Sequence, residues 1–167
     1  MKVIFIMGLP GTGKTYLAKL LAARVDAKHI SSDVVRKEIG KRQHYEPEDK
    51  HEVYREMQAR MESALTEGSH VLVDTTFYSN SLRDEFEKLA KRYTNEIFWV
   101  LTTADETLIK KRVSKKRPDS EADYQVFLMI RNQWDEVTRP HLLVSTDILT
   151  EQELLNKVLI YCDLLKK

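Results

Sequence analysis

The chain has 167 residues, a length that fits one domain built around a single hydrophobic core. Hydrophobic residues make up 42% of it and charged residues 32%, which excludes an intrinsically disordered chain and a membrane-embedded one. The 27 lysines and arginines nearly balance the 26 aspartates and glutamates, so a surface for a polyanion would have to be local.

The cysteine and the N-terminal residues bear on the cellular compartment. Cys162 has no second cysteine for an internal disulfide and lies in an apolar run, which predicts a small core side chain in a reducing environment. The apolar stretch after Lys2 spans five residues, too few for a signal peptide or a membrane span. The five histidines show no spacing typical of zinc ligands. We therefore expect a cytoplasmic protein without a structural metal.

Short β-branched runs alternate with amphipathic stretches along the chain, which predicts a parallel sheet covered by helices on both faces. The expected strands are residues 2–7, 28–30, 71–74, 97–101 and 141–144. The expected helices are residues 14–25, a short one starting at 31–33, 46–67, 79–93, one from 105 into a basic segment, 120–134 and 154–165. This pattern predicts a three-layer α/β/α architecture with a five-stranded sheet, formed by residues 1–167 as one domain.

A complete phosphate-binding P-loop, Gly-Leu-Pro-Gly-Thr-Gly-Lys-Thr, follows the first expected strand directly. Its backbone amides and the N-terminus of the next helix suit a β-phosphate, while Lys14 suits the β- and γ-phosphates. The hydroxyl of Thr15 suits Mg²⁺, which takes few protein ligands. The sequence therefore predicts a site for ATP and Mg²⁺. The expected nucleotide-binding residues are Gly8, Leu9, Pro10, Gly11, Thr12, Gly13, Lys14 and Thr15.

The nearest competing motif is the dinucleotide fingerprint G-x-G-x-x-G, because Gly11 and Gly13 match its first two glycines. Tyr16 stands where the third glycine is needed. The sequence therefore favours a phosphate cradle over a dinucleotide site.

A carboxylate and a guanidinium follow the second expected strand, where ligands of open parallel sheets bind. Asp33 and Arg36 are three residues apart, so they share one face of a helix. Asp33 suits acceptance of the proton from an attacking hydroxyl, and Arg36 suits a phosphate on the acceptor. On spacing alone, a helix cap paired with Arg36 at the surface explains the same residues.

Four motifs in order give the chain its family resemblance: the P-loop, Ser32-Asp33-x-x-Arg36, residues 71–76 (Val-Leu-Val-Asp-Thr-Thr) and a basic segment at residues 110–117. Together they span roughly residues 3–147 and resemble the P-loop kinases related to polynucleotide 5′-hydroxyl kinase, an AAA-type family of predicted kinases. The resemblance implies an adenylate-kinase-like P-loop NTPase fold with a helical lid at about residues 105–120.

The resemblance also implies roles for single residues. Asp33 would be the general base, and Arg36 would bind the acceptor's phosphate. Asp74, at the end of the third expected strand, would hold Mg²⁺ through water or orient Thr15. Thr75 stands where the family has a small residue.

The basic segment is the expected lid, which in the family places arginines four residues apart over the ATP phosphates. Here Lys116 stands four residues after Arg112, and Arg117 stands five residues after it. We expect Arg112 to stack on adenine or clamp a phosphate, and Arg117 or Lys116 to neutralise charge on the transferred group. We expect residues 113–119 to order over bound ATP. A solvated helix face explains the other lysines of the segment.

Several aromatic residues could stack on a base or pack in the core. They are Tyr45, Tyr54, Phe77, Tyr78 and Trp134. We expect Phe77 and Tyr78 to contact a ligand, because they follow the strand that ends in Asp74. Residues 145–147, after the fifth strand, are expected near adenine, and residues 139–141 are expected to form a turn.

These features predict an ATP-dependent kinase that transfers the γ-phosphate to an acceptor hydroxyl. Its expected catalytic residues are Lys14, Asp33, Arg36, Arg112 and Arg117. The favoured acceptor is a polynucleotide 5′-hydroxyl. The alternatives are a small-molecule alcohol such as a nucleoside, sugar or antibiotic, and an aminoacylated tRNA. A nucleotide-dependent switch is a hypothesis of another class, although the sequence has no Asn-Lys-x-Asp element for guanine. The oligomeric state stays open.

Overall fold

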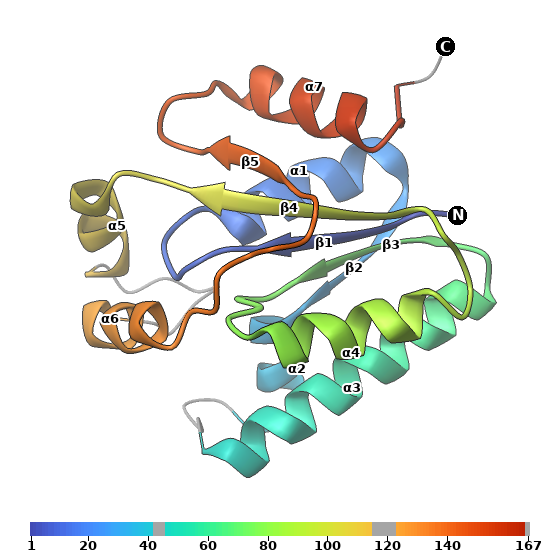
Figure 1. Ribbon diagram of the computed structural model, residues 1–167, viewed down its shortest axis with the longest axis horizontal. Coiled ribbons are helices and arrows are strands. Elements are labelled where there is room, and N and C mark those ends of the chain that lie inside the picture. Colours follow the sequence, from blue (N-terminus) through green and yellow to red (C-terminus); the bar gives the residue numbers. More distant parts are fainter. Residues whose placement is uncertain (42–45, 115–122, 166–167) are drawn as a thin grey trace.

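A computed structural model describes residues 1–41, 46–114 and 123–165 (Figure 1). Five parallel strands form one sheet in the order β2-β3-β1-β4-β5. The strands are β1 (Val3–Met7), β2 (Ala27–Ser31), β3 (His70–Asp74), β4 (Ile97–Thr103) and β5 (Leu142–Ser145). The helices are α1 (Lys14–Val25), α2 (Ser32–Glu38), α3 (Pro47–Thr66), α4 (Asn80–Ala90), α5 (Glu106–Val113), α6 (Tyr124–Asn132) and α7 (Glu151–Tyr161).

The two faces of the sheet are covered by different helices, which confirms the predicted three layers (Figure 1). Side chains of a strand alternate between the faces. Val3 and Phe5 of β1 belong to the core that α3 and α4 cover, whereas Ile4 and Ile6 belong to the core that α1 and α7 cover. Because β1 is buried on both faces, its sequence is an unbroken apolar run.

The core under α4 contains a cluster of aromatic rings, and Phe77 is part of it. Its ring centroid lies 5.5 Å from that of Phe5 and 5.2 Å from that of Phe86, in edge-to-face geometry. Phe77 is fully buried, so the prediction that it contacts a ligand is wrong. The reason is a left-handed backbone, with φ of 50°, which turns the side chain back into the core just after β3.

Two helices begin three or more residues from their predicted starts. α7 begins at Glu151 rather than residue 154, because Thr150 and Glu153 form a capping box. α6 begins at Tyr124, capped by the side chain of Asp123. The predicted start at residue 120 lies outside the described residues.

Cys162 is fully buried in the core beneath α1 and α7, and burial raises the pKa of its thiol to about 12. This confirms the prediction of a small core side chain. Among the described helices, none combines the length and the apolarity that crossing a membrane requires.

The strands all end at the same edge of the sheet, and α5 and α6 lie beside that edge (Figure 1). α2 follows β2 without a linker, and the loop after β1 leads into α1. Residues that follow the strands in sequence are thus gathered at one place in the fold.

Candidate active site

In the loop between β1 and α1, side chains donate hydrogen bonds to a carbonyl oxygen of the same loop. Thr12 Oγ1 donates a hydrogen bond to the carbonyl oxygen of Leu9 at 2.7 Å, and Lys14 Nζ donates to the same oxygen at 3.1 Å. The helix α1 begins after Gly13, which has no side chain to cap its first N–H groups. Those N–H groups and the Lys14 ammonium are therefore suited to an anion at the start of α1.

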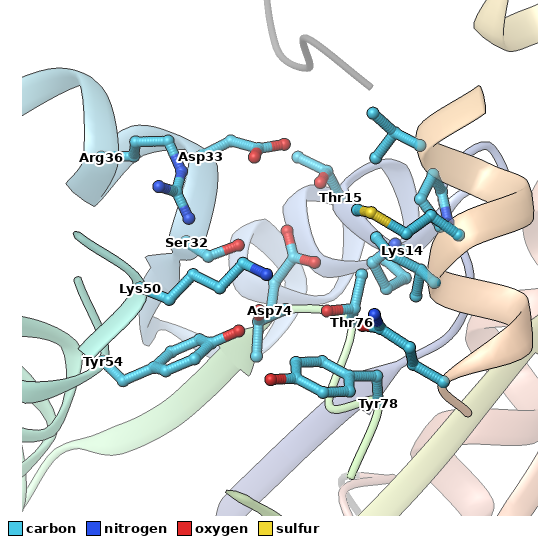
Figure 2. A pocket seen from close by; sticks show the side chains of 16 residues that line it. Lys14, Thr15, Ser32, Asp33, Arg36, Lys50, Tyr54, Asp74, Thr76 and Tyr78 are labelled. Atoms are coloured by element: carbon cyan, nitrogen blue, oxygen red, sulfur yellow. The ribbon is translucent and has the colours of Figure 1, made fainter. Parts of the chain in front are cut away.

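A pocket beyond the ends of β1 and β3 is lined by 16 residues (Figure 2). They come from the loop after β1 and the start of α1, from α2 and α3, from α6 and the residue after it, and from the end of β3 with the residues that follow it. Six of the site residues predicted from sequence are among them: Pro10, Lys14, Thr15, Asp33, Arg36 and Asp74. In Figure 2 the carboxylate of Asp33 points from α2 toward Thr15, across the pocket.

Asp74 ends β3 at the floor of this pocket and is only 2% exposed. Its Oδ2 has no hydrogen-bond partner among the described residues, and it lies 3.4 Å from Nε2 of His29 on β2. Mg²⁺ prefers oxygen ligands and binds through one or two carboxylates together with phosphates and water. A buried carboxylate oxygen without a hydrogen bond, next to the Thr15 hydroxyl in the pocket wall, fits such an ion.

A second hollow lies beside the loop, next to the start of α7. It is lined by Gly11, Gly13, Tyr16, Arg112, Thr146, Leu149, Glu151 and Leu154. Arg112 Nη1 donates to the carbonyl oxygen of Gly11 at 3.1 Å and to Thr146 Oγ1 at 3.2 Å. Thr146 Oγ1 in turn donates to the carbonyl oxygen of Thr12 at 2.7 Å. These bonds hold the guanidinium at the loop, where it can stack on a base or contact a phosphate.

Of the two arginines predicted for the lid, the structure describes only Arg112. Arg112 lies on α5 and contacts the loop, at the second hollow rather than in the first pocket. Arg117 and Lys116 lie outside the described residues. Thr146, predicted near adenine, lines the same hollow as Arg112.

The first pocket also contains two side chains of α3 that the sequence did not single out as polar site residues. Lys50 and Tyr54 are four residues apart, so they share one face of the helix and both line the pocket. Burial raises the pKa of Tyr54 to about 12, and the charge of Arg36 opposes this shift. The Tyr54 hydroxyl therefore stays protonated near neutral pH. The four-residue spacing of Lys50 and Tyr54 in the sequence indicates that they share a helix face. It does not indicate that this face of α3 is turned toward the pocket.

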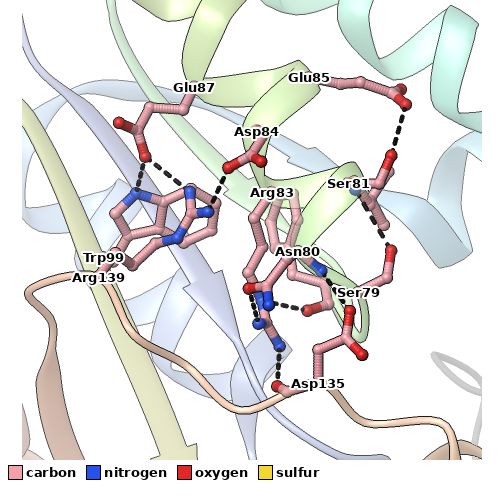
Figure 3. A network of polar contacts seen from close by, with 12 residues as sticks. Ser79, Asn80, Ser81, Arg83, Asp84, Glu85, Glu87, Trp99, Asp135 and Arg139 are labelled. Carbon is pink, nitrogen blue, oxygen red and sulfur yellow. Dashed lines mark hydrogen bonds and ion pairs between the residues drawn. The ribbon is translucent and has the colours of Figure 1, made fainter.

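A fully buried arginine, Arg83 of α4, fixes the walls of the pocket (Figure 3). Its Nε donates to the carbonyl oxygen of Phe77 at 2.7 Å, and its Nη2 donates to the carbonyl oxygens of Asp135 at 3.0 Å and Tyr78 at 3.4 Å. The guanidinium also lies 5.1 Å from the ring centroid of Trp134. Arg83 thereby joins the loop that carries Tyr78 to the segment that follows α6.

The other aromatic and turn predictions have mixed outcomes. Tyr54 and Tyr78 line the pocket, whereas Trp134 packs on Arg83 and Tyr45 lies outside the described residues. Arg139, expected in a simple turn, makes ion pairs with Glu87 at 2.7 Å and Asp84 at 2.6 Å (Figure 3). These ion pairs hold the segment before β5 against α4.

Comparison with known proteins agrees with this arrangement. The family model AAA_33, described as an AAA domain, matches residues 3–140. No curated protein sequence matches the chain.

Solved structures similar to the chain include three whose titles name kinases. A sugar kinase from Janibacter sp. HTCC2649 is 16% identical, with 99% of this chain and 96% of that chain covered and a TM-score of 0.75. A gluconokinase from Sinorhizobium meliloti 1021 is 16% identical, with 97% and 91% covered and a TM-score of 0.71. The Mycobacterium tuberculosis APS kinase, in complex with AMPPNP and APS, is 16% identical, with 99% and 98% covered and a TM-score of 0.69. With the sheet order 2-3-1-4-5, these likenesses establish the P-loop NTPase fold.

Proposed function

Because the chain belongs to the AAA_33 family of AAA domains, whose P-loop it carries, we propose that it is an ATP-dependent kinase acting on an alcohol. The observation that carries the proposal is one pocket in which the carboxylate of Asp33 on α2 points toward Thr15 at the start of α1, with Lys14 lining the same pocket (Figure 2). A phosphotransferase needs an anion cradle and a proton acceptor on opposite sides of a terminal phosphate. This pocket brings both together.

The nucleotide would extend from the second hollow to the first pocket, with its phosphates on the P-loop between them. The backbone N–H groups of residues 11–15 and the ammonium of Lys14 would bind the β- and γ-phosphates. Arg112 and Thr146 line the hollow that would take the base. Thr15 and Asp74 would hold Mg²⁺, which would neutralise negative charge on the phosphates.

The transfer step follows from these positions. The acceptor's hydroxyl oxygen attacks the γ-phosphorus, the bond from that phosphorus to the bridging oxygen breaks, and ADP leaves with the bonding electrons. The carboxylate of Asp33 takes the hydroxyl proton. Arg36 holds the acceptor, and Lys14 stabilises the negative charge that develops. Arg112 contributes by binding the nucleotide from the second hollow. We also propose a charge-neutralising role for Arg117.

The acceptor we propose is a small molecule rather than a polynucleotide end. The sequence favoured a polynucleotide 5′-hydroxyl, but the similar structures are a sugar kinase, a gluconokinase and an APS kinase, which supports the small-molecule alternative. The α6 side chains that line the pocket are also mostly apolar: Val126, Met129 and Ile130. Apolar side chains at the reacting group exclude water, as transfer to an alcohol requires. A nucleotide-dependent switch has no need of a carboxylate opposite the P-loop.

Incubation with γ-labelled ATP, Mg²⁺ and a panel of alcohols tests the function. The panel includes sugars, sugar acids, nucleosides and a 5′-hydroxyl oligonucleotide. Asp33→Asn should reduce transfer by about a hundredfold or more while ATP binding is retained, since a general base contributes that much. Asp163→Asn is the matched control, because Asp163 is 91% exposed and lies just after α7.

Two results would contradict the proposal. Transfer that is unchanged in Asp33→Asn would remove Asp33 as the base. Phosphate release that proceeds equally with and without every alcohol would favour the switch.

A further inference from the structure

Resting on the proposed kinase function, we propose that Lys50 and Arg36 form an anion subsite and that the acceptor is a compact anionic alcohol. Such a molecule carries a carboxylate or phosphate a few bonds from the hydroxyl that is phosphorylated. Lys50 is then a residue that determines acceptor specificity.

The two cations enter the pocket from neighbouring helices. Arg36 lies on α2 and is 7% exposed, and Lys50 lies on the first turn of α3. Figure 2 shows both side chains reaching into the pocket from the same side, with Ser32 between them. Both cations therefore line the space that the acceptor would occupy.

Lys50 has no carboxylate partner within the described parts of the chain. The contact found for its Nζ is the ring of Tyr78, whose centroid is 6.0 Å away. A half-buried ammonium without a counter-ion is unfavourable, because it loses hydration and gains no ion pair. An anionic group on the acceptor would supply the missing partner.

The lining of the pocket supports the same conclusion. On the side formed by α2 and α3, the lining side chains include the cations Arg36 and Lys50 and the carboxylate Asp33. An anionic group on the acceptor would pair with the Lys50 ammonium there.

The spacing along α2 limits the size of the acceptor. Asp33 and Arg36 are three residues apart on one helix face, so their Cβ atoms are about 5–6 Å apart. An acceptor whose hydroxyl reaches Asp33 and whose anion reaches Arg36 or Lys50 must fit within the one pocket that these side chains line. The hydroxyls of Ser32, Tyr54 and Tyr78 line the same half and suit further polar groups of the acceptor.

Matched pairs of acceptors test the inference with the full chain and γ-labelled ATP. The pairs are D-glycerate and glycerol, D-gluconate and D-glucitol, and adenosine 3′-monophosphate and adenosine. The charged member of at least one pair should have a kcat/KM about tenfold or more above its neutral member, as expected for a charge-assisted contact. Carboxylate and phosphate pairs then distinguish the two kinds of anion.

Variants of Lys50 assign the effect to this side chain. Lys50→Gln should lower kcat/KM for the charged acceptor about tenfold and leave the neutral member unchanged, and Lys50→Arg should retain most of the preference. Calorimetric titration of the charged acceptor into the complex with a non-hydrolysable ATP analogue should show the same loss of affinity. Lys88→Gln is the control, because Lys88 is exposed on α4 and does not line the pocket.

The outcomes separate this inference from the kinase proposal. Neutral acceptors that are phosphorylated as well as charged ones, or a preference that survives in Lys50→Gln, would overturn the inference and leave the kinase intact. Absence of transfer to every acceptor, with phosphate release that ignores them, would overturn both.

Discussion

Nε2 of His29 lies 3.4 Å from Oδ2 of Asp74, and neither atom has a hydrogen-bond partner in residues 1–41, 46–114 and 123–165. The two side chains come from adjacent strands, β2 and β3, and the imidazole lies against the carboxylate proposed to hold Mg²⁺. We expect His29→Asn to raise the Mg²⁺ concentration needed for half-maximal activity by about tenfold, because neighbours of metal-binding carboxylates orient them.

The same change is measurable without turnover, as the Mg²⁺ dependence of binding of a non-hydrolysable ATP analogue. His51→Asn, an exposed position on α3, is the control and should leave both measurements unchanged. A Mg²⁺ requirement that is identical in His29→Asn and the unaltered protein would show that the imidazole does not position Asp74.

Arg83 is the buried link between the segment after β3 and the segment after α6, so its loss should affect both stability and the acceptor pocket. Arg83→Met leaves buried carbonyl oxygens without donors, each costing about 1–3 kcal/mol. We expect the free energy of unfolding in urea to fall by about 3–5 kcal/mol in total. Arg92→Met, a mostly exposed arginine just after α4, should have little effect.

A milder substitution at the same position tests the link to the pocket. Arg83→Lys keeps the charge but not the planar fork of donors. It should raise KM for the acceptor more than KM for ATP. Tyr78, which lines the acceptor pocket, lies on the segment that Arg83 holds, whereas Arg112, at the hollow proposed for the base, does not. An equal rise in both KM values would indicate a general loss of structure.

The sheet could be predicted almost completely from sequence, because burial of both faces produces apolar runs such as residues 3–7. The ends of the helices were harder to predict from the sequence. The start of α7 depends on a reciprocal pair of hydrogen bonds between Thr150 and Glu153, and periodicity of apolar residues does not detect such a cap.

The candidate site was predictable where it follows a contiguous motif or a strand end. The P-loop is contiguous, and Asp33 and Asp74 come just after or at the ends of neighbouring strands, with Ser31 opposite Asp74 in the register. Lys50 was missed because its position depends on how α3 packs against α2. Arg83 was missed because two of its hydrogen-bond partners lie 52 and 53 residues away in the sequence.

Gly8 is where the P-loop leaves β1, and a side chain there would collide with β4. A Cβ at this position would lie 2.5 Å from Thr102 Oγ1 and 2.7 Å from the Thr102 carbonyl oxygen, and the residue has a φ of +151°. We expect Gly8→Ala to destabilise the fold and to abolish ATP binding, measured by urea unfolding and nucleotide titration. Gly68→Ala is the matched control, since its φ is +79° but a Cβ would meet nothing within 4 Å. It should cost only about 1–2 kcal/mol and leave ATP binding intact.

His70 at the start of β3 should make stability depend on pH. Its Nδ1 accepts a hydrogen bond from the backbone N–H of Lys2 at 3.0 Å. Burial lowers the pKa of His70 below its ordinary value of 6.5, and the positive charges of the N-terminus and Lys2 add to this. In the pH range between the lowered pKa and 6.5 the unfolded chain binds a proton that the folded chain does not.

The contribution of His70 to the free energy of unfolding is therefore complete above pH 6.5 and is lost as the pH falls from there through the folded pKa. Urea unfolding between about pH 5 and about pH 8 measures it. His70→Gln should flatten the slope in this range, whereas His51→Gln, at an exposed position, should keep it. If His70→Gln kept the full slope, another group would have to account for the titration, because a neutral amide cannot take up the proton that the unfolded histidine binds.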